Sequence, residues 1–447
     1  MSELLDLAAQ TIELAKKAGA TDAECTASEG EEFSVNVRMG EIETLKQAGS
    51  RGAGLRILIG RHTGSAYTSD LSAEGIRKLV DSAIELGAIT SEDPFAGLPE
   101  VCELGATEGD LRLFNEDIAV LPPSERIEMA KRAEAAALSA DPRITNSEGA
   151  SFDSYEGRRV FANSRGFAGE YRGSYCAISA VPVAKTGDRM ERDYWSSAAR
   201  RLADLESPEH VGKTAAERTL RRLGARKVST RKVPVVFEAR VGRSLLGDLF
   251  AAVEGRSIYR QSSFLIGKID SPIASPRVTV IDDGTIPGLF GTQPFDDEGV
   301  RTRRTPVVEG GVLRSWLLNT YSARKLDLKS TGNAARGITG NAGVGHGNFY
   351  IEAGPRTPAE IIGSIPDGFY VTELMGSGVN IASGDYSHGA SGIWIENGQL
   401  AYPVSEVTIA GTLQEMLLNL EPANDLEFRG SVASPALLVG EMTVGGT

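Results

Sequence analysis

The chain has 447 residues, of which 41% are hydrophobic and 24% are charged, which is typical of a globular protein of two or three domains. It carries 60 acidic and 47 basic residues, a formal charge of −13, which argues against a general binder of anionic nucleic acid. Three cysteines without paired spacing predict neither a disulfide framework nor a zinc ribbon.

The cellular location can be predicted from the same features. Unpaired cysteines favour a reducing compartment. Glu3 and Asp6 lie where a signal peptide would need an apolar run, and no stretch approaches the ~18 apolar residues of a membrane span. We therefore expect a cytoplasmic protein that does not associate with membranes.

Residues 1–90 predict a helix, about four antiparallel strands and a second helix. Apolar residues at helical spacing predict the first helix from Leu4 to Ala15. Ser72 is expected to cap the second helix, which ends before Gly87. Alternating apolar and polar residues predict the strands between them, at 33–39, 42–45, 55–59 and 66–68.

The same order then recurs. A helix starts at Ser124, and another opens at Ser207 and closes at Gly224. The tripeptide Ser-Arg-Gly at 50–52 returns at 164–166. Strands are predicted between the two helices, at 159–163, 170–180 and 190–196. This recurrence is the basis of a hypothesis of internal duplication.

A basic, turn-rich segment at 224–232 is expected to separate two domains. We predict an N-terminal α/β domain with an antiparallel sheet over 1–225 and a β-rich C-terminal domain over 226–447, an α+β fold. The second domain should begin with a strand at 233–237 and a helix that buries Leu245 and Leu249. Short strands separated by Gly and Pro follow, at 277–281, 307–318, 347–352, 368–373, 392–395 and 404–409.

Two charged segments each allow two interpretations. Residues 358–447 hold eleven acidic residues and one basic residue, Arg429, which indicates either a solvated surface or a docking face for a basic partner. Asp296, Asp297 and Glu298 could bind a hard cation. The arginines that follow these acids favour a self-neutralising surface turn.

A glycine-flanked segment at 384–389 contains residue types that can act on or bind a peptide. Asp385, Ser387 and His388 are the types used as orienter, nucleophile and base. Residues so close along a turn rarely converge on one centre. We therefore favour a turn that holds a peptide main chain, with Asp385, Tyr386, Ser387 and His388 as substrate-binding candidates.

Three segments, at 294–305, 317–334 and 371–413, resemble the TldD/PmbA proteases, once called modulators of DNA gyrase. The chain is more similar to the PmbA branch, also called TldE. The resemblance implies an N-terminal α/β domain, a β-rich C-terminal domain and a dimer that encloses a proteolytic chamber. It also implies that TldD-type subunits hold zinc on a His-Glu-x-x-x-His helix, with a cysteine near the C-terminus as a further ligand.

The chain departs from that motif at every functional position. The corresponding segment has Glu238 and Arg243 in place of the two histidines and Ala239 in place of the general base. No cysteine follows Cys176. Arginine is a permanent cation and alanine cannot take a proton, so we predict no catalytic residue and no metal site here. The resemblance implies zinc in a TldD-like partner instead.

We therefore expect the zinc-free subunit of a cytoplasmic peptidase complex, in which a TldD-like chain supplies the metal. This chain would form part of the chamber wall and hold peptides or small unfolded proteins. The resemblance implies a heterodimer, with a homodimer as the default when the partner is missing. Two alternatives remain, a non-catalytic homodimeric peptide- or protein-binding module and a metal-independent hydrolase.

Overall fold

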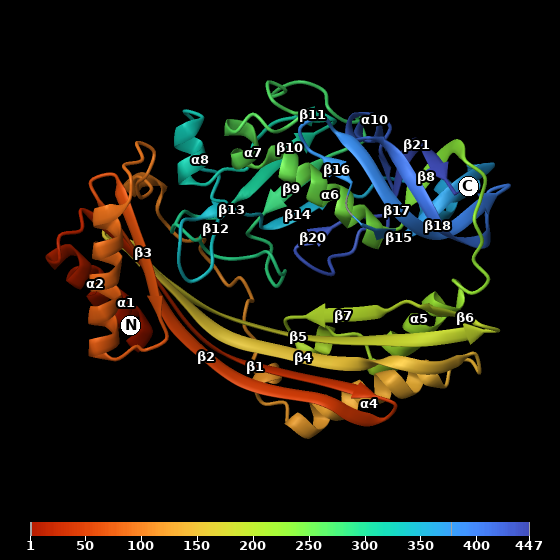
Figure 1. Ribbon diagram of the computed structural model, residues 1–447, viewed down its shortest axis with the longest axis horizontal. Coiled ribbons are helices and arrows are strands. Elements are labelled where there is room, and N and C mark those ends of the chain that lie inside the picture. Colours follow the sequence, from red (N-terminus) through yellow and green to blue (C-terminus); the bar gives the residue numbers. More distant parts are fainter. Residues whose placement is uncertain (1, 377, 447) are drawn as a thin grey trace.

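A computed structural model describes residues 2–376 and 378–446 (Figure 1). The first half of the chain forms a seven-stranded antiparallel sheet in the order β3-β2-β1-β4-β5-β6, with β7 paired to β5. Figure 1 shows that this sheet is strongly curled. Its strands are β1 (Asp22–Arg38), β2 (Glu41–Ile59), β3 (His62–Thr68), β4 (Ile144–Asn163), β5 (Ala168–Thr186), β6 (Arg189–Arg192) and β7 (Trp195–Ala199).

Two helix pairs cover the two ends of this sheet (Figure 1). The predicted order of helix, strands and helix occurs twice, with three strands in the first unit and four in the second, while its origin by duplication stays a hypothesis. None of the described helices is long and apolar enough to cross a membrane. The helices of this half are α1 (Glu3–Lys17), α2 (Ala73–Ile89), α3 (Glu116–Ala119), α4 (Pro123–Leu138) and α5 (Pro208–Leu220), with single 3-10 turns at Val101–Glu103 and Leu202–Asp204.

The strands are much longer than the sequence predicts, and glycines explain the difference. Gly30, Gly157 and Gly173 lie opposite one another across β1, β4 and β5. The ring of Tyr155 fills the space over Gly30 and Gly157, where an added Cβ would come within 2.8 and 2.2 Å of its atoms. These glycines therefore mark close packing in the middle of long strands and not the ends of short ones.

The second half of the chain is β-rich, as predicted, and contains a closed barrel. The order β15-β8-β21-β18-β17 closes because β15 also pairs with β17. A second sheet has the order β11-β10-β9-β14-β20, and β12 pairs with β13. The strands of the barrel sheet are β8 (Arg231–Phe237), β15 (Asp367–Met375), β16 (Val379–Asn380), β17 (Asp385–Glu396), β18 (Gln399–Thr412), β19 (Glu421–Pro422) and β21 (Leu437–Gly445).

The remaining elements lie on or beside these two sheets (Figure 1). The main helix, α6 (Ala239–Val253), follows β8 directly and buries Leu245, Leu249 and Val253, as predicted. The other elements are β9 (Val280–Asp283), β10 (Arg304–Glu309), β11 (Val312–Leu313), β12 (Ala334–Ala335), β13 (Gly343–Val344), β14 (Asn348–Ile351), β20 (Val432–Ala433), α7 (Gly255–Tyr259), α8 (Thr320–Lys325), α9 (Pro358–Gly363) and α10 (Leu413–Leu418).

A loop of the second half, residues 336–341, lies directly on the first sheet, and we call it the strap. Arg336 donates to the carboxylate of Glu24 at 2.5 Å, and both side chains are almost fully buried. Arg56 donates to the same carboxylate at 2.9 Å and to Asn341 at 2.8 Å. The carbonyl of Ile338 lies against β2. The strap therefore joins the two halves through buried charge and close backbone contact.

The turn predicted at 296–299 forms, but it is buried and does not lie at the surface as predicted. Asp296 is 0% exposed and Glu298 is 5% exposed. Asp296 accepts the backbone N–H groups of Glu298, Val300 and Ala334, and Glu298 accepts that of Thr320. Backbone donors, and not the following arginines, therefore satisfy these two carboxyl groups.

Candidate functional site

The segment that corresponds to the family's zinc motif lies at a rigid strand-to-helix junction. Val235 and Phe237 of β8 are fully buried. Glu238 is the N-cap residue of α6, although its side chain makes no capping hydrogen bond. Because a buried strand and a core helix flank it, the backbone of this junction is fixed, and the side chains decide what the site can bind.

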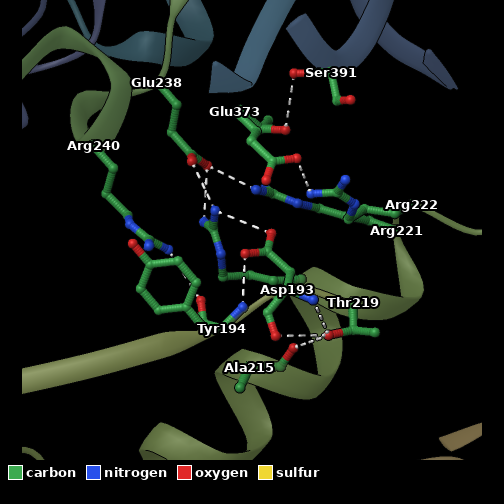
Figure 2. Close-up of polar contacts among 12 residues, drawn as sticks. Asp193, Tyr194, Ala215, Thr219, Arg221, Arg222, Glu238, Arg240, Glu373 and Ser391 are labelled. Atoms are coloured by element: carbon green, nitrogen blue, oxygen red, sulfur yellow. Dashed lines mark hydrogen bonds and ion pairs between the residues drawn. The ribbon is translucent and has the colours of Figure 1, made fainter. Parts of the chain in front are cut away.

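Two arginine side chains of the first half form ion pairs with the Glu238 carboxylate. Figure 2 labels one of them, Arg221. Arg218 on α5 donates to both carboxylate oxygens, at 3.1 and 3.0 Å, and Arg221 donates to one of them at 3.0 Å. Arg218 also pairs with Asp193 at 3.3 Å. Burial alone would lower the pKa of Arg218, but Glu238 and Asp193 outweigh it and hold that pKa above its usual value. Glu238 therefore acts as an ion-pair partner that joins α5 to α6.

The ionic cluster continues along the end of α5. Arg222 pairs with Glu373 at 2.6 Å (Figure 2). It also pairs with Glu191 at 3.3 Å. This cluster was not predicted from the sequence, because three arginines near a helix C-terminus are also expected on a solvated helix end. Their signal was their density, since Arg218, Arg221 and Arg222 lie within five positions.

The other two motif positions cannot do the chemistry of a zinc peptidase. Ala239 has no group that could accept a proton from water. Arg243 is half-buried, and its Nε donates to the carbonyl of Arg240 at 3.4 Å. Burial lowers the pKa of Arg243, as do the nearby charges of Arg240 and Arg429. Within residues 2–376 and 378–446, no group of three His, Cys, Asp or Glu side chains is arranged to hold a metal.

The segment at 384–389, predicted as a turn, is largely the start of strand β17. Successive side chains of a strand point to opposite faces. Asp385 and Ser387 are exposed on one face, whereas Tyr386 and His388 lie on the other, with their rings 4.7 Å apart. Asp385, Ser387 and His388 therefore do not converge, and the arrangement does not support a catalytic triad.

Tyr386 was predicted to bind substrate at the surface, but its side chain lies in the core. Its side chain is 2% exposed and its ring lies 6.4 Å from the ring of Phe237. Its buried hydroxyl has no hydrogen-bond partner among the described residues. Burial, with a smaller effect from Asp248, raises the pKa of Tyr386. Of the four substrate-binding candidates, only Asp385 and Ser387 present exposed side chains, and Asp385 already accepts from Ser383 at 2.6 Å.

Two substitutions test the burial of Tyr386. Tyr386→Ala should cost about 3–5 kcal/mol of unfolding free energy, because it leaves a cavity in the core. Tyr386→Phe should change stability by less than about 1 kcal/mol, since it removes a hydroxyl that has no partner. Urea unfolding of both variants measures the difference. A mild effect of Tyr386→Ala would show that the ring lies at the surface.

Comparison with known proteins identifies the family to which this chain belongs. Three family models match in order: PmbA/TldA metallopeptidase domain 1 over 23–87, the central domain over 116–223 and the C-terminal domain over 230–446. The chain belongs to the PmbA/TldD metallopeptidase family. It is 40% identical to Metalloprotease PmbA of Escherichia coli O157:H7 over 447 residues, which is 99% of this chain and 96% of the relative.

Solved structures of this family have the same architecture. A candidate DNA gyrase modulator from Bacteroides thetaiotaomicron superposes with a TM-score of 0.93 at 28% identity, covering 100% of both chains. TldE from Thermococcus kodakarensis superposes with a TM-score of 0.86 at 21% identity, covering 98% of this chain and 100% of that one, a similarity of fold. The residues at 238, 239 and 243 do not fit the zinc that the family name implies.

Proposed function

We propose that this chain is the zinc-free, PmbA/TldE-type subunit of a cytoplasmic peptidase complex. A TldD-like subunit would supply the zinc, and this chain would form part of the chamber wall and hold peptides or small unfolded proteins. The observation that carries the proposal is the capture of Glu238 by Arg218 and Arg221. A carboxylate held by two guanidinium groups is occupied by charge-assisted hydrogen bonds and does not serve as a metal ligand.

The comparisons support a PmbA-like chain, while the pairing with a TldD-like chain rests on the family resemblance. The curated relative named PmbA and the structure named TldE each match this chain over nearly its full length. All three cysteines, Cys25, Cys102 and Cys176, are free thiols, which suits a reducing compartment. The exposed side chains of Asp385 and Ser387 remain the candidates for peptide contact at β17.

Metal analysis tests the loss of the zinc site. The purified chain, prepared without chelator, should contain far less than one zinc per molecule. Arg243 is a cation that cannot bind zinc, and Ala239 has no group that could bind zinc or activate a water. A TldD-like chain prepared in the same way serves as the positive control. About one zinc per chain, lost in Glu238→Ala, would contradict the proposal.

The alternative is a homodimeric peptide- or protein-binding module without hydrolytic activity in any assembly. Light scattering of the chain alone and with a TldD-like chain distinguishes the two. The proposal predicts that the heterodimer replaces the homodimer, with an interface well above ~1,000 Å². A homodimer that persists beside the added chain favours the binding module. A metal-independent hydrolase is disfavoured, since Asp385 and Ser387 lie on the face opposite His388.

A further inference from the structure

Two arginines in the first two turns of α6, Arg240 and Arg243, differ from the other arginines around them. Arg240 and Arg243 make no ion pair with any carboxylate of the described residues, whereas Arg218 on α5 and Arg221 and Arg222 just after it all do. Their polar contacts are to backbone carbonyls, from Arg240 to Tyr194 at 3.0 Å and from Arg243 to Arg240 at 3.4 Å. Two cations therefore lie side by side without an internal counter-ion.

Aromatic side chains hold one of these guanidinium groups in place. The guanidinium carbon of Arg240 lies 4.1 Å from the ring centroid of Tyr194 and 5.4 Å from that of Trp195 (Figure 2 shows Arg240 against Tyr194). Arg429 stacks on Trp195 at 4.4 Å, but it is paired with Glu206 and Glu427. A guanidinium fixed by stacking keeps its outer N–H groups in a defined fork, at little further cost in side-chain entropy.

The arrangement is unfavourable for the helix that carries it. Cations are disfavoured near a helix N-terminus, because that end already has a partial positive charge. The first turn of α6 has no acidic residue, and its N-cap carboxylate, Glu238, is engaged by Arg218 and Arg221. Arg243 is also half-buried. A half-buried cation without an opposite charge beside it normally costs stability, and a ligand of opposite charge would offset that cost.

We propose that Arg240 and Arg243 bind a carboxylate group of the peptide, either its free carboxyl terminus or an acidic side chain. This inference rests on the proposed peptide-holding role and adds a preference for anionic substrates. Guanidinium groups match the planar geometry of a carboxylate and donate two parallel hydrogen bonds to it. In this subunit, the positions that correspond to the metal-binding helix turn would thus recognise charge and perform no chemistry.

Four fluorescent hexapeptides of one sequence test the inference. One has a free carboxyl terminus, one is amidated, and two are amidated with Glu or Gln at a central position. Dissociation constants are measured by anisotropy with the full complex, in chelator so that the peptides stay intact. The variants are Arg240→Gln and Arg243→Gln, and Arg314→Gln is the charge-matched control, since Arg314 is exposed and already paired with Asp270.

We expect a carboxylate-bearing peptide to bind at least about tenfold more tightly than its neutral counterpart. Arg240→Gln and Arg243→Gln should each reduce this preference and leave the neutral peptide's affinity unchanged, whereas Arg314→Gln should keep the preference. The arm that shows the preference identifies its source, the carboxyl terminus or the acidic side chain. The melting temperature of Arg243→Gln should not fall, because the variant removes an unpaired cation beside two others.

Three results would overturn the inference. Equal affinity for all four peptides would remove the anionic preference while leaving peptide binding intact. A preference that survives both substitutions would assign it to other residues. Arginine variants that lose assembly with the TldD-like chain but keep the preference would make the pair an interface element. If no peptide binds, the proposed peptide-holding role fails with it.

Discussion

Replacing Arg336 by Met should destabilise the protein by about 3–5 kcal/mol, because it breaks a buried ion pair and leaves the Glu24 carboxylate with one cation. The side chains of Arg336 and Glu24 are 3% and 1% exposed. Water cannot replace the lost partner at that depth. The change also removes a contact that holds the strap to β1, so the two halves of the molecule should separate more readily.

Thermal and urea unfolding measure this effect, with Arg314→Gln as the matched control. Arg314 and its partner Asp270 are 43% and 71% exposed, so losing that pair should cost less than about 1 kcal/mol. Equal effects of the two substitutions would contradict the buried role of Arg336.

The pH dependence of the Arg336→Met effect has a defined sign. Burial would raise the pKa of Glu24, but Arg336 and Arg56 outweigh it and lower the pKa below 4.5. The stability that the charged Glu24 carboxylate contributes is therefore fully present above the ordinary pKa of a glutamate. It is lost as the pH falls through the lowered pKa of the folded state. The difference between the wild type and Arg336→Met should narrow in acid and stay constant near neutrality. A difference that widens in acid would contradict this assignment.

Replacing Gly54 by Ala should displace the strap. An added Cβ would lie 1.6 Å from the carbonyl oxygen of Ile338 and 2.6 Å from its carbonyl carbon. Both atoms belong to the backbone, so no side-chain rotation relieves the clash. We expect a loss of at least about 2 kcal/mol. Because Arg336 begins the strap, limited trypsin digestion should cleave after it faster in the variant than in the wild type.

Gly49→Ala is the control, since Gly49 lies on the same strand and a Cβ there meets no atom within 4 Å. That substitution should change stability by less than about 0.5 kcal/mol and leave the tryptic cleavage rate unchanged. If Gly54→Ala behaves like Gly49→Ala, the strap does not rest on β2 as described.

The sequence predicted the α+β class and the main helices, because their apolar spacing is local and regular. It shortened β1 and divided β2 into two short strands, since glycines such as Gly30 and Gly49 resemble turn signals when cross-strand packing is not visible. Gly384 and Gly389 misled in the same way. They flank a segment that tertiary contacts place in a barrel strand, with Tyr386 turned into the core.

The candidate site was found from the family motif and not from physical patterns alone. The departures from the zinc motif at Glu238, Ala239 and Arg243 can be read from the sequence. The ion pair with Arg218 cannot be predicted from it, because Arg218 lies 20 positions before Glu238 and belongs to the other half of the molecule. The unpaired state of Arg240 is equally invisible, since pairing depends on which acidic side chains the fold brings near.

Peptide cleavage by separate and mixed subunits tests the central claim most directly. This chain, a TldD-like chain and their equimolar mixture are assayed on the same unfolded peptide, with and without chelator. We predict no cleavage by this chain alone, much faster cleavage by the mixture than by either chain, and loss of activity in chelator. Cleavage by this chain alone in chelator, or a mixture no faster than the TldD-like chain by itself, would contradict its role as the zinc-free subunit of the peptidase.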